Sequence, residues 1–155
     1  AEPRLGVENE DRDPRALDLY RHLVETGAWW DLVDEIATHL VHDELLEYWN
    51  RTAPIMRAWA VDPDMWVRRT AILCQNGSKL RTDTALLADV IVPNLEGGRY
   101  ADAAGRQDFF IRKAIGWALR EYSYHAPSWV AAFVDEHRDA MAGLTVREAL
   151  RRLGR

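Results

Sequence analysis

Apolar residues recur at three- and four-residue intervals along most of the chain, which is the pattern of amphipathic helices. No stretch shows the strict alternation or the density of β-branched residues that is typical of strands. We therefore predict an all-α fold. The predicted helices cover residues 13–27, 28–40, 43–60, 65–74, 83–95, 108–122, 127–134 and 145–154.

Local signals predict where several of these helices begin and end. Asp64 precedes an apolar helical run, so we expect it to act as an N-cap, and Asp83 or Thr84 is expected to open the next helix. Gly27 is expected to close the first helix as its C-cap. Pro54 is expected to break or kink the helix over residues 43–60. The sequence Thr145-Val146-Arg147-Glu148 matches a capping box, which predicts the start of the last helix there.

The second predicted helix carries two adjacent tryptophans followed by a carboxylate. Its buried stripe is expected to contain Trp29, Leu32 or Val33, Ile36 and Leu40. On that phasing Trp30 and Asp34 lie to one side of the stripe and, being four residues apart, on the same face. A flat indole ring beside a negative charge suits a cationic, sugar-like or base-like ligand. The same pair also fits an aromatic core residue beside an ordinary surface acid.

Two bulky apolar residues open three of the predicted helices, as Trp29-Trp30, Met65-Trp66 and Phe109-Phe110, at spacings of 36 and 44 residues. Such spacings are typical of stacked helical hairpins of the HEAT or armadillo kind, which curve into a solenoid with a concave face. The positions one turn into these helices hold Asp34, Arg69 and Lys113. We therefore expect a carboxylate and two cations to line up along the concave face.

Charge is distributed unevenly along the 155 residues. The net charge is -5, but residues 1–48 hold 13 acids and 4 bases, whereas residues 49–155 hold 12 acids and 16 bases. A basic face can therefore exist on an acidic protein. Cys74 is the only cysteine, which excludes a disulfide within the chain and a thiolate metal cluster. With no signal-type or membrane-spanning run, the expected location is the cytoplasm.

Three ordered segments resemble one known family. They are Trp29–Asp34, Met65–Ile72 and Asp108–Tyr122. Together they are similar to the DNA alkylation repair family, the AlkD-like DNA glycosylases built from HEAT-like repeats, over nearly the whole chain from Leu19 to Leu150. Residues 1–12 are polar and acidic without periodicity, so we expect a polar tail or linker there. On the resemblance, residues 13–155 are expected to form a single HEAT-like domain that lacks the N-terminal repeats of the full-length family.

The resemblance implies a function and a set of site residues. Enzymes of this family hydrolyse the N-glycosidic bond of cationic N3- or N7-alkylated purines in duplex DNA, without a metal or another cofactor. By motif, the catalytic aspartate corresponds to Asp34, the two tryptophans around the deoxyribose to Trp30 and Trp117, and the arginine that holds the DNA backbone to Arg69.

Neighbouring cations extend the expected DNA-backbone site to Arg68, Lys113 and Arg120. Lys113 and Arg120 lie on the face of Trp117, at i-4 and i+3. Arg68 and Arg69 are adjacent, so they are expected to point in different directions. The expected partner is double-stranded DNA containing alkylated purines, with no membrane, no obligate protein partner and a monomeric state.

Other interpretations remain open on the sequence. Asp34 by composition alone is a solvated surface acid, and Trp117 in an apolar helix fits core packing equally well. The chain also fits a non-catalytic helical-repeat scaffold that binds DNA structures or a protein partner, or a repair fold that is inactive as an isolated piece. The loop over residues 96–107 has no assigned role.

Overall fold

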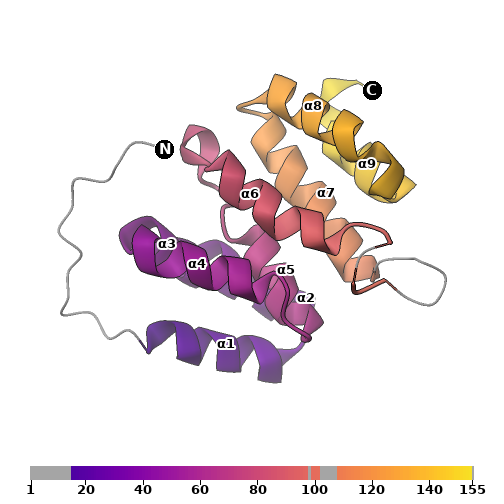
Figure 1. Cartoon of the computed structure of the whole chain (residues 1–155). Coiled ribbons are helices and arrows are strands. Elements are labelled where there is room, and N and C mark those ends of the chain that lie inside the picture. Colours follow the sequence, from indigo (N-terminus) through magenta and orange to yellow (C-terminus); the bar gives the residue numbers. More distant parts are fainter. Residues whose placement is uncertain (1–14, 98, 102–107, 155) are drawn as a thin grey trace.

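The computed structural model describes residues 15–97, 99–101 and 108–154, and within these ranges the secondary structure is entirely helical (Figure 1). The all-α prediction is therefore confirmed for the described residues. The α-helices are α1 (Ala16–Gly27), α2 (Trp30–Glu35), α3 (His42–Glu47), α4 (Trp49–Trp59), α5 (Met65–Leu73), α6 (Thr84–Ile91), α7 (Phe109–Ser123), α8 (Pro127–His137) and α9 (Gly143–Leu150). A π-helix, η1 (Ile36–Val41), joins α2 to α3, and 3-10 turns cover η2 (Lys79–Arg81), η3 (Val92–Asn94), η4 (Arg138–Ala140) and η5 (Arg151–Leu153).

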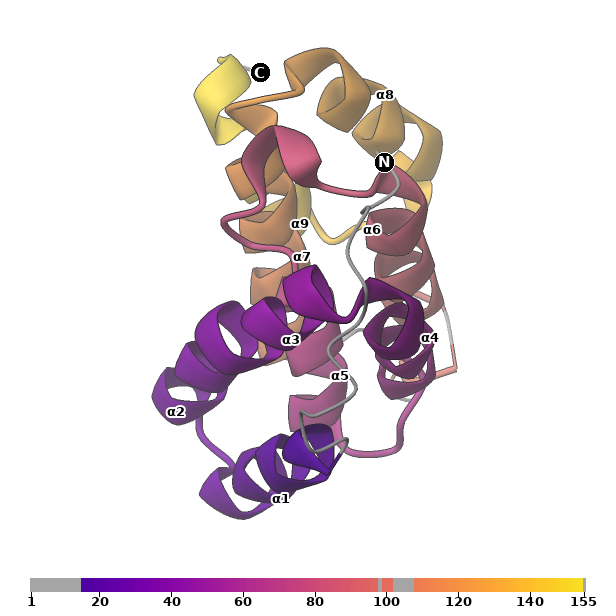
Figure 2. The same ribbon diagram turned by 90° about the vertical axis from the view of Figure 1, so that its left-hand side faces the viewer.

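The helices form two layers. Helices α4, α6 and α8 lie at the front in Figure 1 and on the right in Figure 2, whereas α2, α5, α7 and α9 form the other layer. Within the second layer α5 packs against both α2 and α7, and α7 packs against α9. This stacking of helix pairs fits a helical-repeat fold. The curvature of a solenoid and its concave face remain predictions.

Three aspartates cap helices: Asp64, as predicted, Asp83, one of two residues predicted to open its helix, and Asp108, for which no cap was predicted. The Asp64 carboxylate accepts hydrogen bonds from the amides of Trp66 and Val67 at the start of α5. Asp83 accepts one at the start of α6, and Asp108 accepts one at the start of α7. Each carboxylate satisfies amides that have no partner inside the helix, so these sites fix where α5, α6 and α7 begin.

The predicted core stripe of the second helix is confirmed only in its middle. Val33 and Ile36 are buried as predicted, whereas Trp29 and Leu40 are exposed. The buried stripe also contains Ala37 and Val41. The reason is the π-helix η1, in which each turn takes up more residues than an α-turn, so the stripe moves from Leu40 to Val41.

Three other boundary predictions differ from the structure. Helix α9 begins at Gly143, and Thr145 lies inside it, where its hydroxyl donates to the carbonyl of Arg112 on α7. The predicted capping box is therefore wrong. Gly27 is the last residue of α1, and Ala28 takes the left-handed conformation that ends it, with φ of +42°. Helix α4 continues through Pro54, where a break or kink was predicted. The helical segments are instead interrupted at Tyr48, between α3 and α4.

Several predictions fall on residues that the structure does not describe. The polar tail over residues 1–12 lies outside the described ranges, as do residues 98 and 102–107 of the 96–107 loop. No helix within those ranges is long and apolar enough to cross a membrane.

Candidate functional site

The paired aromatic residues at the starts of α2, α5 and α7 come together in space. The ring centroid of Trp66 lies 6.2 Å from that of Trp29 and 5.0 Å from that of Phe110, and Trp29 and Phe110 are 5.7 Å apart. Helix starts separated by 36 and 44 residues in sequence are therefore neighbours, as the repeat predicts. Trp66 is half-buried against the core, whereas the side chain of Trp29 is 52% exposed.

One turn into the same helices, Asp34 and Arg69 form a bidentate ion pair. Arg69 Nε donates to Asp34 Oδ1 over 2.8 Å, and Nη2 donates to Oδ2 over 2.9 Å. The side chains are only 6% (Arg69) and 13% (Asp34) exposed. Parallel donors on a planar fork fix the plane of the carboxylate as well as its position. Asp34 and Arg69, which the helical repeat predicts to line up, are therefore in direct contact.

Arg69 is also held from its other side. Its Nη1 donates to the carbonyl oxygen of Phe110 over 2.5 Å, in the first turn of α7. The guanidinium thus bridges α2 and α7 from α5, and its contacts point into the protein. These contacts fix the orientation of the Asp34 carboxylate. The expected contact of Arg69 with the DNA backbone stays a prediction. The carbonyl of Phe110 was not identifiable from sequence, since any residue supplies one.

The two tryptophans expected around the substrate differ in exposure. Trp30 lies one turn before Asp34 on α2, and its side chain is 47% exposed. Trp117 lies on α7, where it is half-buried and packs against the core. Trp30 therefore offers an open ring surface next to the ion pair, and Trp117 offers a partial one.

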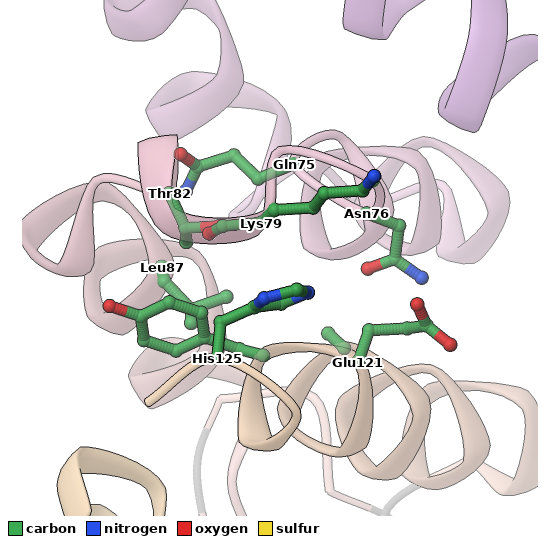
Figure 3. A pocket seen from close by; sticks show the side chains of 10 residues that line it. Gln75, Asn76, Lys79, Thr82, Leu87, Glu121 and His125 are labelled. Carbon is green, nitrogen blue, oxygen red and sulfur yellow. The ribbon is translucent and has the colours of Figure 1, made fainter. Parts of the chain in front are cut away.

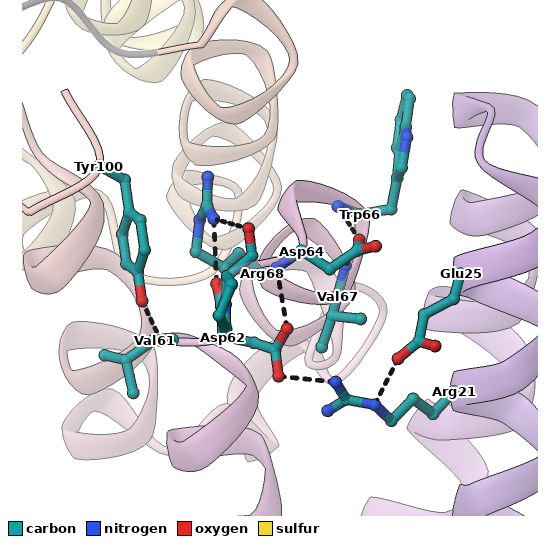
Figure 4. Close-up of polar contacts among 10 residues, drawn as sticks. Arg21, Glu25, Val61, Asp62, Asp64, Trp66, Val67, Arg68 and Tyr100 are labelled. Carbon is teal, nitrogen blue, oxygen red and sulfur yellow. Dashed lines mark hydrogen bonds and ion pairs between the residues drawn. The ribbon is translucent and has the colours of Figure 1, made fainter. Parts of the chain in front are cut away.

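Arg68 points away from Arg69, as expected for adjacent residues. Its Nη1 donates to the carbonyls of Asp62 and Pro63 at 3.0 and 3.1 Å, and its guanidinium lies 3.9 Å from the ring centre of Tyr100 (Figure 4). Burial lowers the pKa of Arg68 from its usual value. With these contacts Arg68 braces the turn between α4 and α5.

Lys113 and Arg120 lie on α7 and are both half-buried. Arg120 Nη1 donates to Glu148 Oε1 over 2.9 Å, and this hydrogen bond raises the pKa of Arg120. Lys113 has no ion-pair partner among the residues that the structure describes. Of the four expected backbone-binding cations, Lys113 therefore has the freest head group.

Comparison with known families supplies the identification. A family model described as "DNA alkylation repair enzyme" matches residues 5–153. The chain belongs to the DNA alkylation repair enzyme family. A solved structure described as a "Predicted DNA alkylation repair enzyme from Enterococcus faecalis" is similar, with a TM-score of 0.76 and 27% identity. The match covers 93% of this chain and 62% of that one. Comparison with curated proteins gives no match.

A pocket lies at the C-terminal end of α7, away from the Asp34–Arg69 pair. This partly open pocket of about 70 Å³ lies between η2, the residues before it and the second half of α7 (Figure 3). Asn76, Glu121 and His125 line it, and Asn76 Nδ2 is buried without a hydrogen-bond partner among the described residues. None of the site residues predicted from the family motifs lines this pocket.

Metal ligands were not expected from the sequence. In residues 15–97, 99–101 and 108–154, no group of three or more His, Cys, Asp or Glu side chains is placed to hold a metal ion.

Proposed function

We propose that this chain is a DNA glycosylase that hydrolyses the N-glycosidic bond of cationic N3- or N7-alkylated purines in duplex DNA. Membership of the DNA alkylation repair enzyme family supports this proposal. The observation that carries it is the placement of Asp34, held by Arg69 one turn after the exposed ring of Trp30.

The proposed reaction requires from the protein mainly a fixed negative charge beside the sugar. An alkylated purine is already cationic, so it leaves with the electron pair of the C1′–N bond and needs no proton. Positive charge then grows on the sugar, and a carboxylate beside C1′ stabilises it. Water adds to C1′, and its proton passes to Asp34 and then to solvent. The products are a neutral free base and an abasic site.

Arg69 is assigned the role of positioning Asp34. A carboxylate oxygen can accept two hydrogen bonds, and the guanidinium fork occupies one on each oxygen. The remaining lone pairs and the 13% exposure of the side chain leave Asp34 able to accept from a water molecule. The third contact, to the carbonyl of Phe110, prevents the fork from turning away.

The aromatic and cationic residues around the pair supply binding. An exposed Trp30 ring is suited to lie against the deoxyribose or the cationic purine, and each well-placed ring contributes about 0.5–2 kcal/mol. The solvent-exposed part of the Trp117 ring is proposed to contact the deoxyribose or the purine in the same way. Lys113, and to a lesser extent Arg120, are proposed to contact DNA phosphates, which fixes register without reading sequence.

The ion pair also favours a second candidate, a non-catalytic helical-repeat module that binds DNA structures or a protein partner. A guanidinium in direct contact with both oxygens of Asp34 offsets part of the negative charge that the reaction would use. In this alternative the Asp34–Arg69 pair simply ties α2 to α5.

Base release separates the two candidates. Duplex DNA treated with a methylating agent is incubated with the protein, and free N3-methyladenine and N7-methylguanine are measured by chromatography. The glycosylase proposal predicts release well above the spontaneous rate, with an abasic site left in the strand. Salt-sensitive binding of branched DNA without any release would instead establish the scaffold function.

A further inference from the structure

Four helices of the second layer share one register. Counted from the first residue of α2, α5, α7 and α9, the seventh position is Ile36, Ala71, Ile115 and Ala149, and each of these is at most 3% exposed. Equivalent positions in the four helices therefore face the core in the same way, although the repeat was visible in the sequence for only the first three.

The fifth position of the same register holds a charged residue in each of the four helices, and these residues are hereafter called the row. It is Asp34 in α2, Arg69 in α5 and Lys113 in α7, and in α9 it is Arg147. Asp34 and Arg69 are in direct contact, so the fifth positions of α2 and α5 are neighbours. Because α7 packs on α5 and α9 packs on α7, the shared register extends this row to Lys113 and then to Arg147.

Local contacts keep the Arg147 head group at the helix-start end of α9. A Cβ atom on Gly143 would lie 3.1 Å from Arg147 Nη1, so the guanidinium lies back over the first turn of α9. The helix starts of α2, α5 and α7 at the same end hold the Trp29, Trp66 and Phe110 rings. A glycine at position 143 leaves room for this placement.

The charge of Arg147 is available to a partner. Its side chain is exposed, and among the described residues it has no ion pair. The adjacent acid, Glu148, is already engaged by Arg120 across the α7–α9 contact. Lys113 is unpaired in the same part of the structure. Two neighbouring positions of the row thus present positive charge with no acid bound to them.

We propose that Lys113 and Arg147 form a phosphate-binding track that carries one DNA strand away from Asp34, and that Arg147 is a DNA-backbone-binding residue. The inference rests on the proposed function in that its partner is duplex DNA. Adjacent packed helices are roughly 8–10 Å apart, so Lys113 on α7 and Arg147 on α9 are separated by about that distance. With a rise of about 3.4 Å per nucleotide, this length follows one strand over about three nucleotides.

The test measures binding of the chain to a fluorescein-labelled, undamaged 20-base-pair duplex at several KCl concentrations. Each phosphate contact contributes about 0.9 to the slope of log affinity against log salt. Arg147→Ala and Lys113→Ala are each expected to lower the slope by about that amount, and Arg147→Lys is expected to retain it. The matched control is Arg138→Ala, which removes the same charge from an exposed arginine on η4 that pairs with Asp135.

An Arg147→Ala slope equal to that of wild type, or to that of Arg138→Ala, would overturn the track. Because the duplex carries no lesion, this result is independent of base release. A reduced slope in a protein that releases no base would uphold the track and reject the glycosylase. Base release that is lost in Asp34→Asn, together with an unchanged salt slope in Arg147→Ala, would uphold the glycosylase and reject the track.

Discussion

Replacing Arg69 with methionine removes the cation that holds Asp34 while keeping most of the side-chain volume. The substitution deletes the two hydrogen bonds to the Asp34 carboxylate and the one to the carbonyl of Phe110. It leaves a carboxylate that is only 13% exposed beside an apolar side chain. The folded state then contains a poorly solvated charge that is fully hydrated after unfolding.

The expected loss of stability follows from this burial. Removing one partner of a buried ion pair costs about 3–5 kcal/mol, and the residual exposure of Asp34 places this case near about 3 kcal/mol. For a chain of this size that corresponds to a fall in melting temperature of about 10 °C. The double variant Asp34→Leu/Arg69→Met removes both charges and should regain most of the loss.

Urea unfolding followed by circular dichroism measures both variants, with Arg57→Met as the matched control. Arg57 also pairs with an aspartate, Asp89, over 2.8 Å, but the two side chains are 40% and 54% exposed, so its loss should cost no more than about 1 kcal/mol. An Arg69→Met effect as small as that of Arg57→Met would refute the reasoning, as would a double variant less stable than the single one.

Three further predictions follow from burial and capping. Trp30→Ala should change the unfolding free energy by less than about 1 kcal/mol, because its ring is exposed. Trp66→Ala removes a ring from the aromatic cluster and should cost about 2–4 kcal/mol. Similar losses for both variants in urea titrations would contradict this prediction. Burial raises the pKa of the Cys74 thiol to about 12 from 9.0, so the folded state keeps a proton that the unfolded state releases, and stability should fall by about 1.4 kcal/mol per pH unit above pH 9. Unfolding titrations between pH 8 and 10.5 should show this slope in wild type but not in Cys74→Ala. Asp64→Ala should cost about 1 kcal/mol through the lost cap of α5, whereas Asp64→Asn should cost less.

The sequence is most informative where structure depends on neighbours along the chain. Asp64, Asp83 and Asp108 cap helices because a short carboxylate placed before an apolar run satisfies free amides whatever the rest of the fold does. The repeated aromatic pairs predict that distant helix starts adjoin, and the Trp29–Trp66–Phe110 cluster confirms it.

Features that depend on tertiary packing were not predictable in the same way. The π-helix η1 shifts the buried stripe from Leu40 to Val41, and the Trp29 ring packs on Trp66 and Phe110 at the helix starts and not in the core. Of the predicted row of Asp34, Arg69 and Lys113, the structure shows the contact between Asp34 and Arg69. This contact depends on the distance between α2 and α5, and the third hydrogen bond of Arg69 goes to a backbone carbonyl.

The central claim is that the carboxylate of Asp34 lowers the barrier to base loss. The most direct measurement is the single-turnover rate of N3-methyladenine release from duplex DNA by Asp34→Asn, compared with Asp62→Asn. Asp62 is a fair control because it is also an arginine-paired carboxylate, 15% exposed, and lies outside the row. With both variants shown to be folded, we expect Asp34→Asn to lose about a hundredfold or more in rate and Asp62→Asn to stay near wild type. Equal rates for the two variants would contradict the account.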